Sequence, residues 1–132
     1  MTAASAGYFT PVATATYIRL TTFRRDGRAV ATPVHVVVTA DRTRAYFRTW
    51  DVTGKAKRIR HTASVEIAPA TFRGRTLGPA IKATARLLDG AESEQAAALL
   101  AARHPVLHGL LIPWYHRRRG WITQQYQLSP PG

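Results

Sequence analysis

The strongest constraint on the fold is a hairpin signal near the start of the chain. In Thr16–Phe23, β-branched and aromatic residues dominate, and outward positions alternate with the inward set Ile18, Leu20 and Thr22, which predicts a half-buried strand. Asp26 and Gly27 come shortly after it, and glycine accepts the positive φ that a tight turn requires. We therefore expect the chain to turn straight back into a second strand over Ala29–Thr39.

The second predicted strand contains the nearly continuous apolar run 34–38, which is typical of a strand buried on both sides. Pro33 lies within it and has no N–H to donate, so it must occupy an edge or a bulge. After a turn at Ala40–Thr43, a third strand over Arg44–Trp50 is expected to complete an antiparallel meander.

The rest of the chain alternates between helix and strand patterns. Thr53 is a natural N-cap for a short helix up to Thr62, and Asp89 is expected to cap an alanine-rich helix over Glu92–Arg103 that has two acids in its first turn. Between Val106 and Trp121 the pattern indicates only a helical or irregular segment. Further strands are predicted over Val65–Ala68, Ile81–Leu88 and Trp121–Leu128, with a glycine-rich loop over Phe72–Pro79.

This order of elements predicts a mainly β fold. Six antiparallel strands and two or three helices favour a barrel with helical insertions, and no repeat or linker divides residues 1–132, so we expect one domain.

Charge and composition narrow the function classes. The chain has 19 Lys and Arg against 7 Asp and Glu, a net charge of +12, which favours an anionic partner. The excess is distributed: residues 1–50 and 51–90 carry +5 each, and residues 91–132 carry +2. The absence of cysteine excludes disulfide scaffolds, zinc ribbons and thiolate chemistry, and no apolar run approaches the roughly 20 residues of a membrane span. The first residues do not form a secretory signal, so we expect a cytoplasmic protein.

A phosphate site is predicted at the start of the first helix. A helix N-terminus presents unpaired N–H groups and the positive end of the helix dipole, and Thr53, Gly54 and Lys55 add a hydroxyl, room for close approach and an ammonium group. Arg58 shares a helical face with Lys55; Lys57 lies near them, and Thr49 adds a hydroxyl from the preceding strand. A solvated basic face is the alternative interpretation of the same residues.

Several of these motifs together resemble a known family. The pattern D-G-x-x-x-x-T-P-V from Asp26, Y-F-x-T from Tyr46, T-G-K-A-K-R-I-R from Thr53 and R-G-R-T-L-G-P from Arg73 are similar to the split β-barrel flavin and deazaflavin oxidoreductases. These belong to the pyridoxamine-phosphate-oxidase-like superfamily, and the likeness is strongest to the branch that uses the deazaflavin cofactor F420. It covers roughly residues 15–90.

The resemblance implies an FMN-binding split-barrel type of fold and a homodimer with cofactor pockets between the two protomers. It implies that the backbone of the strand through Thr32, Pro33, Val34 and Val36 lines the cofactor ring. The cofactor phosphate is then held by residues that the helix pattern also selects, namely Thr49, Thr53, Lys55, Lys57 and Arg58. Hydride chemistry would belong to the cofactor, with the protein supplying orientation and electrostatics.

Two features depart from the family or from any pattern. Relatives commonly have Trp after Thr-Pro-Val, whereas this chain has His35. This histidine either orients a substrate or donates a proton, or it is a hydrogen-bonded core residue. The cluster Arg117–Arg119 either meets the cofactor or is a solvated patch. The acidic residues and histidines show no metal-ligand spacing.

The leading hypothesis is an oxidoreductase that passes hydride from reduced F420 to a small electrophilic acceptor such as an enone, a quinone or a tetrapyrrole. FMN is the alternative cofactor. A non-catalytic cofactor carrier is the alternative from another class. A nucleic-acid module is disfavoured because the sequence has no recognised nucleic-acid motif and its aromatics are not interleaved with the basic clusters.

Overall fold

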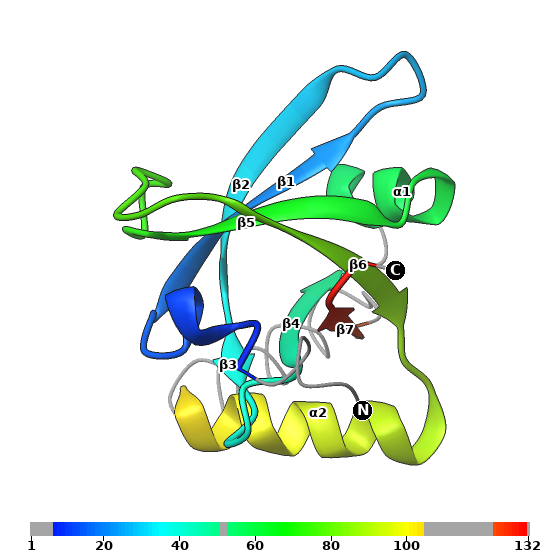
Figure 1. Ribbon diagram of the computed structural model, residues 1–132. Helices are drawn as coiled ribbons and strands as arrows, with labels where there is room; N and C mark the ends of the chain where they lie inside the picture. Colours follow the sequence, from blue (N-terminus) through cyan, green and yellow to red (C-terminus); the bar gives the residue numbers. More distant parts are fainter. Residues whose placement is uncertain (1–6, 51–52, 105–122, 132) are drawn as a thin grey trace.

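The computed structural model describes residues 7–50, 53–104 and 123–131 (Figure 1). All strand pairings are antiparallel, and the strands form one sheet in the order β2-β1-β5-β6-β7-β4-β3. The elements are η1 (Thr10–Val12), β1 (Tyr17–Phe23), β2 (Ala29–His35), β3 (Val37–Val38), β4 (Ala45–Trp50), α1 (Gly54–His61), β5 (Ser64–Ala70), β6 (Ile81–Leu87), α2 (Gly90–Arg103) and β7 (Thr123–Ser129).

The predicted hairpin is confirmed. Gly27 has φ of +88°, and the Asp26 carboxylate accepts hydrogen bonds from the backbone N–H of Arg28 at 3.0 Å and from its Nε at 2.8 Å. This Asx turn brings β2 back along β1 in register, with Arg19 opposite Pro33. On its other side β2 has no neighbour among the described strands, which is the edge position that Pro33 needs.

The predicted strand over Ala29–Thr39 is wrong in one respect, because it bends. Its two halves, β2 and β3, lie at opposite ends of the strand order, although only Val36 separates them in the chain. The bend closes the sheet into a barrel, because β2 pairs with β1 at one end of the strand order and β3 pairs with β4 at the other. Counted as one bent strand, β2 and β3 leave the six strands that the sequence predicts.

The predicted meander is confirmed when β2 and β3 are counted as one bent strand, because β1 pairs with β2 and β4 pairs with β3. The expected burial on both faces is wrong, because Val34 and Val36 are buried while Val37 and Val38 are only half-buried.

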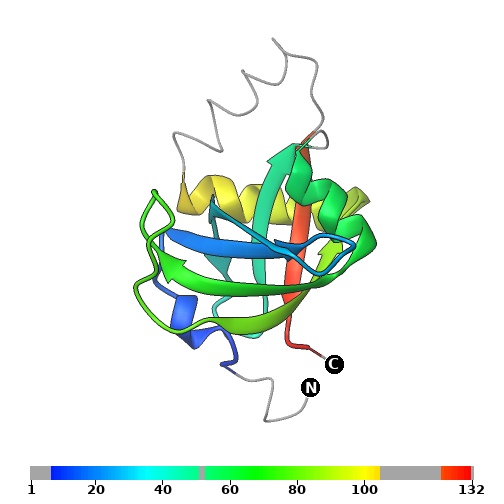
Figure 2. The ribbon, with the colours of Figure 1, turned by 90° about the horizontal axis from the view of Figure 1, so that it is seen from above.

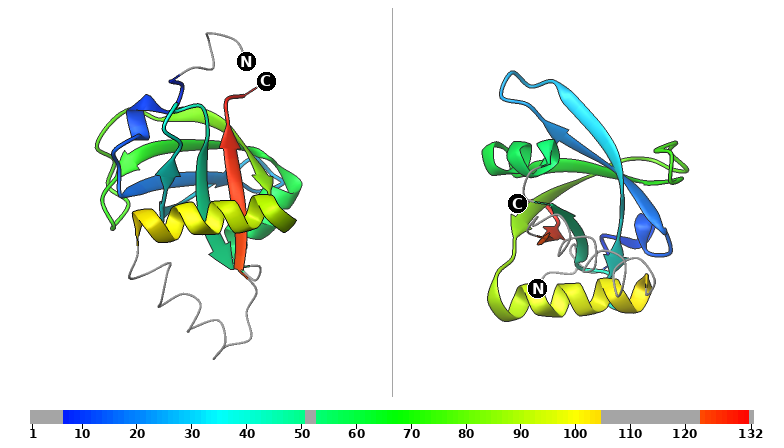
Figure 3. Two further views of the ribbon diagram at one scale, coloured as in Figure 1. Left: turned by 90° about the horizontal axis from the view of Figure 1, so that it is seen from below. Right: turned by 180° about the vertical axis from the view of Figure 1, so that it is seen from behind.

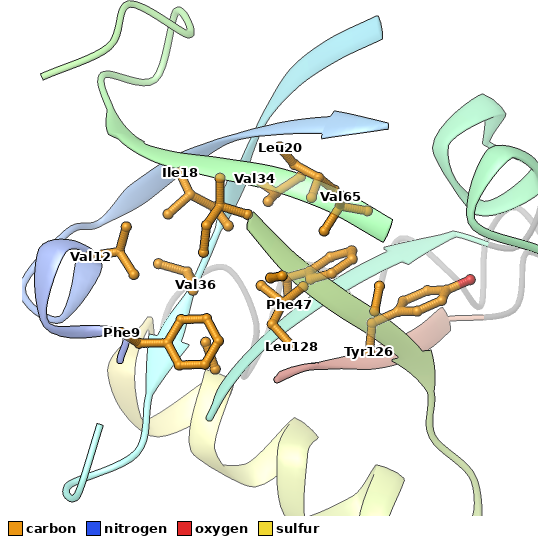
Figure 4. Packing of buried hydrophobic residues seen from close by; sticks show 14 of the residues in the cluster. Phe9, Val12, Ile18, Leu20, Val34, Val36, Phe47, Val65, Tyr126 and Leu128 are labelled. Atoms are coloured by element: carbon orange, nitrogen blue, oxygen red, sulfur yellow. The ribbon is translucent and has the colours of Figure 1, made fainter. Parts of the chain in front are cut away.

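The barrel interior holds the apolar core (Figure 4). The Phe47 ring from β4 stacks on the Tyr126 ring from β7 with centroids 5.1 Å apart, and Ile18 and Leu20 from β1 are fully buried. Each such side chain contributes about 1.5–3 kcal/mol relative to exposure. The short η1 turn adds Phe9 and Val12 to this cluster, and the sequence pattern missed that turn.

The two helices occupy different places on the barrel. α1 lies beside β1 near the tip of the β1–β2 hairpin (Figure 2), and it packs through Ala56 and Ile59. α2 crosses the outside of β4 and β7 (Figure 3), where Ala96 and Leu100 are buried. Neither of these helices is long and apolar enough to cross a membrane.

The start of α2 differs from the prediction. The helix begins at Gly90, so only Glu92 lies in its first turn, and the Asp89 side chain makes no capping hydrogen bond. Glu92 pairs instead with Arg86 at the end of β6, with the two side chains 2.8 Å apart. The segment over 106–121 for which we expect a helical or irregular path lies outside the described residues.

Candidate functional site

The N-terminus of α1 carries the predicted cap. Thr53 Oγ1 accepts the Ala56 N–H at 3.3 Å, and the Thr53 carbonyl accepts the Lys57 N–H at the same distance. Gly54 and Lys55 are the first two residues of α1, so no carbonyl group four residues earlier within the helix can accept their N–H groups. The helix start therefore presents donors to an anion.

Thr49 joins this end of the helix from the neighbouring strand. Its side chain is buried at the end of β4, and its Oγ1 lies 3.0 Å from Thr53 Oγ1. The structure thus brings together two hydroxyls that the sequence placed in one site.

Arg58 folds back over the first turn of α1. Its Nε donates a hydrogen bond to Thr22 Oγ1 on β1 at 2.5 Å. An added Cβ at Gly54 would lie 2.7 Å from a terminal nitrogen of this guanidinium, so glycine leaves the space that Arg58 uses. We call Thr22, Thr49, Thr53, Lys55 and Arg58 the α1 cluster.

The charged side chains of the α1 cluster, Lys55 and Arg58, are both positive. Burial lowers the pKa of Lys55, and the neighbouring Arg58 charge lowers it further. The pKa of Arg58 is lowered by burial and by the charge of Arg24. Within the described residues the ion pairs are Arg28–Asp26 and Arg86–Glu92, so no described carboxylate pairs with these cations. A neighbouring positive charge thus lowers the pKa of each of these two cations, and a bound anion would be favoured there.

The donor set fits a phosphate monoester. It combines hydroxyls, an ammonium group, a guanidinium and a helix N-terminus, which are the groups that hold phosphate in proteins. Sequence reasoning missed Thr22 and Arg24. The available signal was Thr22 itself, a polar residue at an inward position of a strand whose other inward positions are Ile18 and Leu20.

Lys57 is the predicted phosphate residue that lies apart from the α1 cluster. Its side chain is exposed, and no side-chain hydrogen bond or ion pair to the other members is described for it.

The strand predicted to line a cofactor ring divides between the two faces of β2. Val34 and Val36 are in the core, and Pro33 is exposed on the outer face. Thr32 has a buried Oγ1 for which the described residues provide no hydrogen-bond partner. It is paired with Leu20, two positions from Thr22 on β1, so Thr32 and Thr22 share the inner face of the hairpin. An unpaired buried hydroxyl is costly, and a ligand on this face would relieve it.

His35 lies on the opposite face of β2 from Thr32. Its ring stacks on His104 at 4.1 Å and contacts Tyr17 at 4.5 Å, and His104 Nε2 lies 3.0 Å from the Val36 carbonyl oxygen. Burial, then the charges of His104 and Arg103, lower the pKa of His35 to about 4. Its ring is therefore neutral at pH 7. The pairing of β1 with β2 places His35 opposite Tyr17, at the other end of β1 from Thr22 of the α1 cluster.

The predicted cluster Arg117–Arg119 lies outside the described residues. Within the described part of the chain, no group of three His, Cys, Asp or Glu side chains is placed to hold a metal ion.

Comparisons with known proteins give matches in structure only. No protein family model and no curated protein sequence matches the chain. Among solved structures, the heme storage protein HutZ from Vibrio cholerae has a TM-score of 0.68 at 13% identity over 90% of this chain and 84% of its own. An F420-H2 dependent reductase, FDR-A, has a TM-score of 0.62 at 13% identity over 86% and 94%.

A third match is a protein described as a putative pyridoxamine 5'-phosphate oxidase from Listeria innocua. It has a TM-score of 0.53 at 14% identity over 89% of this chain and 85% of its own. Identities this low establish shape and not activity. The chain therefore has the split β-barrel fold of the pyridoxamine-phosphate-oxidase-like proteins, and the resemblance expected from its sequence is confirmed at the level of the fold.

Proposed function

We propose that this protein binds a flavin-type cofactor through the α1 cluster and serves as an oxidoreductase, with F420 as the cofactor and FMN as the alternative. The observation that carries the proposal is the α1 cluster itself: cations and hydroxyls with no described carboxylate partner, gathered at a helix N-terminus. Structural neighbours that include F420-dependent reductases support the same choice of cofactor.

Each member of the cluster has a distinct role in this proposal. Lys55 and Arg58 neutralise the cofactor phosphate, and the first N–H groups of α1 donate to its oxygens. Thr49 and Thr53 add hydroxyl donors, and Thr22 holds Arg58 in place over Gly54. Lys57, which is exposed on the same helix, adds long-range attraction for the anion.

The hairpin supplies the surface for the ring. Thr32 offers its buried hydroxyl on the face shared with Thr22, and the edge of β2 offers backbone groups that none of the described strands uses. Bound in reduced form, the deazaflavin supplies a hydride to an electrophilic acceptor such as an enone, a quinone or a tetrapyrrole. The protein's own task is to bind and orient both molecules.

We further propose that the protein works as a homodimer with the pockets completed between two copies. Phe72 and Leu77 support an association surface, because their side chains are 63% and 66% exposed in the single chain.

A non-catalytic binder is the second candidate, because HutZ, which shares the fold, is described as a heme storage protein. Turnover separates the two functions: an oxidoreductase consumes reduced F420 in the presence of an enone or quinone, whereas a storage protein binds its ligand without consuming it. A nucleic-acid partner would instead show affinity for DNA or RNA that falls steeply with salt.

The binding proposal is tested by titrating the protein with F420 and with FMN, followed by fluorescence. Lys55→Ala is expected to weaken binding of the preferred cofactor by about 1–3 kcal/mol, because a charged contact to phosphate is lost. Lys82→Ala, an exposed lysine on β6, is the matched control and should leave the affinity unchanged. Absence of binding for both cofactors, or equal losses in the two variants, would refute the proposal.

A further inference from the structure

A second basic site lies on the outer face of the β1–β2 hairpin. A hollow of about 380 Å³ is lined by Arg19 from β1, by residues 31–33 of β2, and by Arg73, Gly74 and Arg75 from the loop between β5 and β6. That loop is the green one at the left of Figure 1. We call this hollow the arginine pocket; it is large enough for a small organic molecule.

The loop that closes the arginine pocket is built by its own backbone. Thr71 is its organising residue: its carbonyl accepts the Gly74 N–H at 2.9 Å, its N–H donates to the Arg75 carbonyl at 2.9 Å, and its Oγ1 accepts the Arg75 N–H at 3.2 Å. Gly74 has φ of +86°, and a Cβ there would lie 3.8 Å from Pro33 Cδ. The turn is thus hydrogen-bonded and rests against β2, which positions two arginines.

All three arginines of the pocket are exposed, and the surroundings of two of them are defined. The Arg73 guanidinium carbon lies 5.4 Å from the centre of the Phe72 ring, and that ring is 6.4 Å from the Tyr17 ring. Arg19 is on β1 directly opposite Pro33, so its side chain projects on the outer face.

The charge of the arginine pocket is uncompensated within the described structure. Its lining contains three arginines and no carboxylate, and the two described ion pairs use Arg28 and Arg86. Three guanidinium groups line one hollow, and each can donate bidentate hydrogen bonds to an anion that carries several oxygens.

We propose that the arginine pocket is a binding site for a small molecule that carries two or more carboxylate or phosphate groups. It is distinct from the α1 cluster, because Arg19 and Pro33 are on the outer face of the hairpin whereas Thr22 is on its inner face. The pocket shares Thr32 and Pro33 with the strand proposed to line the cofactor ring, but none of the residues proposed to hold the cofactor phosphate lines it.

The test uses citrate and pyrophosphate as probes, titrated into the full chain by calorimetry at constant ionic strength. We expect binding of at least one probe with Kd below about 1 mM. Arg73→Gln, Arg75→Gln and Arg19→Gln are each expected to weaken it about tenfold. Binding of citrate alone assigns carboxylates, binding of pyrophosphate alone assigns phosphates, and either result supports the site.

Two controls separate this pocket from general charge and from the α1 cluster. Arg60→Gln removes the same charge from an exposed position of α1 and should change Kd by less than twofold, and Lys55→Ala should leave probe binding intact. On the unmodified protein, the amide NMR signals of Gly74 and Arg75 should shift on addition of the probe. The proposal is overturned if neither probe binds, if Arg60→Gln weakens binding as much as Arg73→Gln does, or if the NMR shifts avoid the 71–76 loop.

Discussion

The hydrogen bond between Thr22 on β1 and Arg58 on α1 joins the barrel to the helix. The substitution Thr22→Val removes this bond with little change in side-chain shape. Thr22 is buried on the inner face of β1, and its Oγ1 accepts Arg58 Nε at 2.5 Å. Valine keeps the branched side chain and the strand preference, so the substitution leaves no large cavity. What is lost is one acceptor for a guanidinium, together with the longer hydrogen bond that Thr22 Oγ1 donates to the Val30 carbonyl at 3.4 Å.

The expected magnitude follows from the exposure of the two partners. A hydrogen bond to a charged group is worth about 1.5–3 kcal/mol when both partners are shielded from water. Arg58 is only half-buried, so water replaces part of the interaction and the expected loss in free energy of unfolding is about 1 kcal/mol. Because Arg58 is then free to leave Gly54, cofactor binding should weaken by about threefold to tenfold.

The assay measures the free energy of unfolding in urea for variants whose m-values agree with that of the unmodified protein. It is paired with the fluorescence titration of the cofactor. Thr21→Val is the matched control, because it makes the same substitution at the next residue on the outer side of β1, where no side-chain hydrogen bond is described. We expect Thr21→Val to be neutral or slightly stabilising. Equal effects of the two substitutions on stability and on affinity would show that the Thr22–Arg58 bond organises nothing.

Two further predictions concern pH and the hairpin turn. Folding lowers the pKa of His35 from 6.5 to about 4, so the unfolded chain binds that proton more readily; the free energy of unfolding should be highest above pH 6.5 and fall as the pH approaches 4. The ring is half-buried between Tyr17, His104 and Arg103, which limits the loss to about 1–2 kcal/mol, and urea titrations at several pH values should show a smaller slope for His35→Gln. Gly27→Ala places a Cβ in open space but at φ of +88°, so backbone strain alone should cost about 1 kcal/mol; an unchanged urea midpoint would contradict this.

Local patterns in the sequence were sufficient for most of the fold. The Asp26–Gly27 turn, the N-cap at Thr53 and the end of the second helix at Arg103 are short-range features, and each was predicted. The bend at Val36 was not predicted, because the residues around it continue the same apolar run and only the pairing of distant strands requires it.

The candidate site follows the same division. Thr49, Thr53 and Lys55 are close in sequence, so the first turn of a helix and the strand before it sufficed to group them. Thr22 and Arg58 are 36 residues apart in the sequence, so no local pattern indicates that their side chains form a hydrogen bond. The arginine pocket was missed for the same reason, since Arg19 and Arg73 meet only after β1 and β5 pair.

Only Val36 separates β2 from β3, so the closure of the barrel fixes the number of residues in this segment. Side chains alternate sides along β2 and β3, so inserting or deleting one residue at Val36 would turn Val37 and Val38 to the opposite side and put β3 out of phase with β4. The spacing between Pro33 on the rim and the closing strand is therefore fixed by the barrel's geometry. Substitutions along this stretch can vary its surface chemistry, but its length fixes the position of β2 relative to the rest of the barrel.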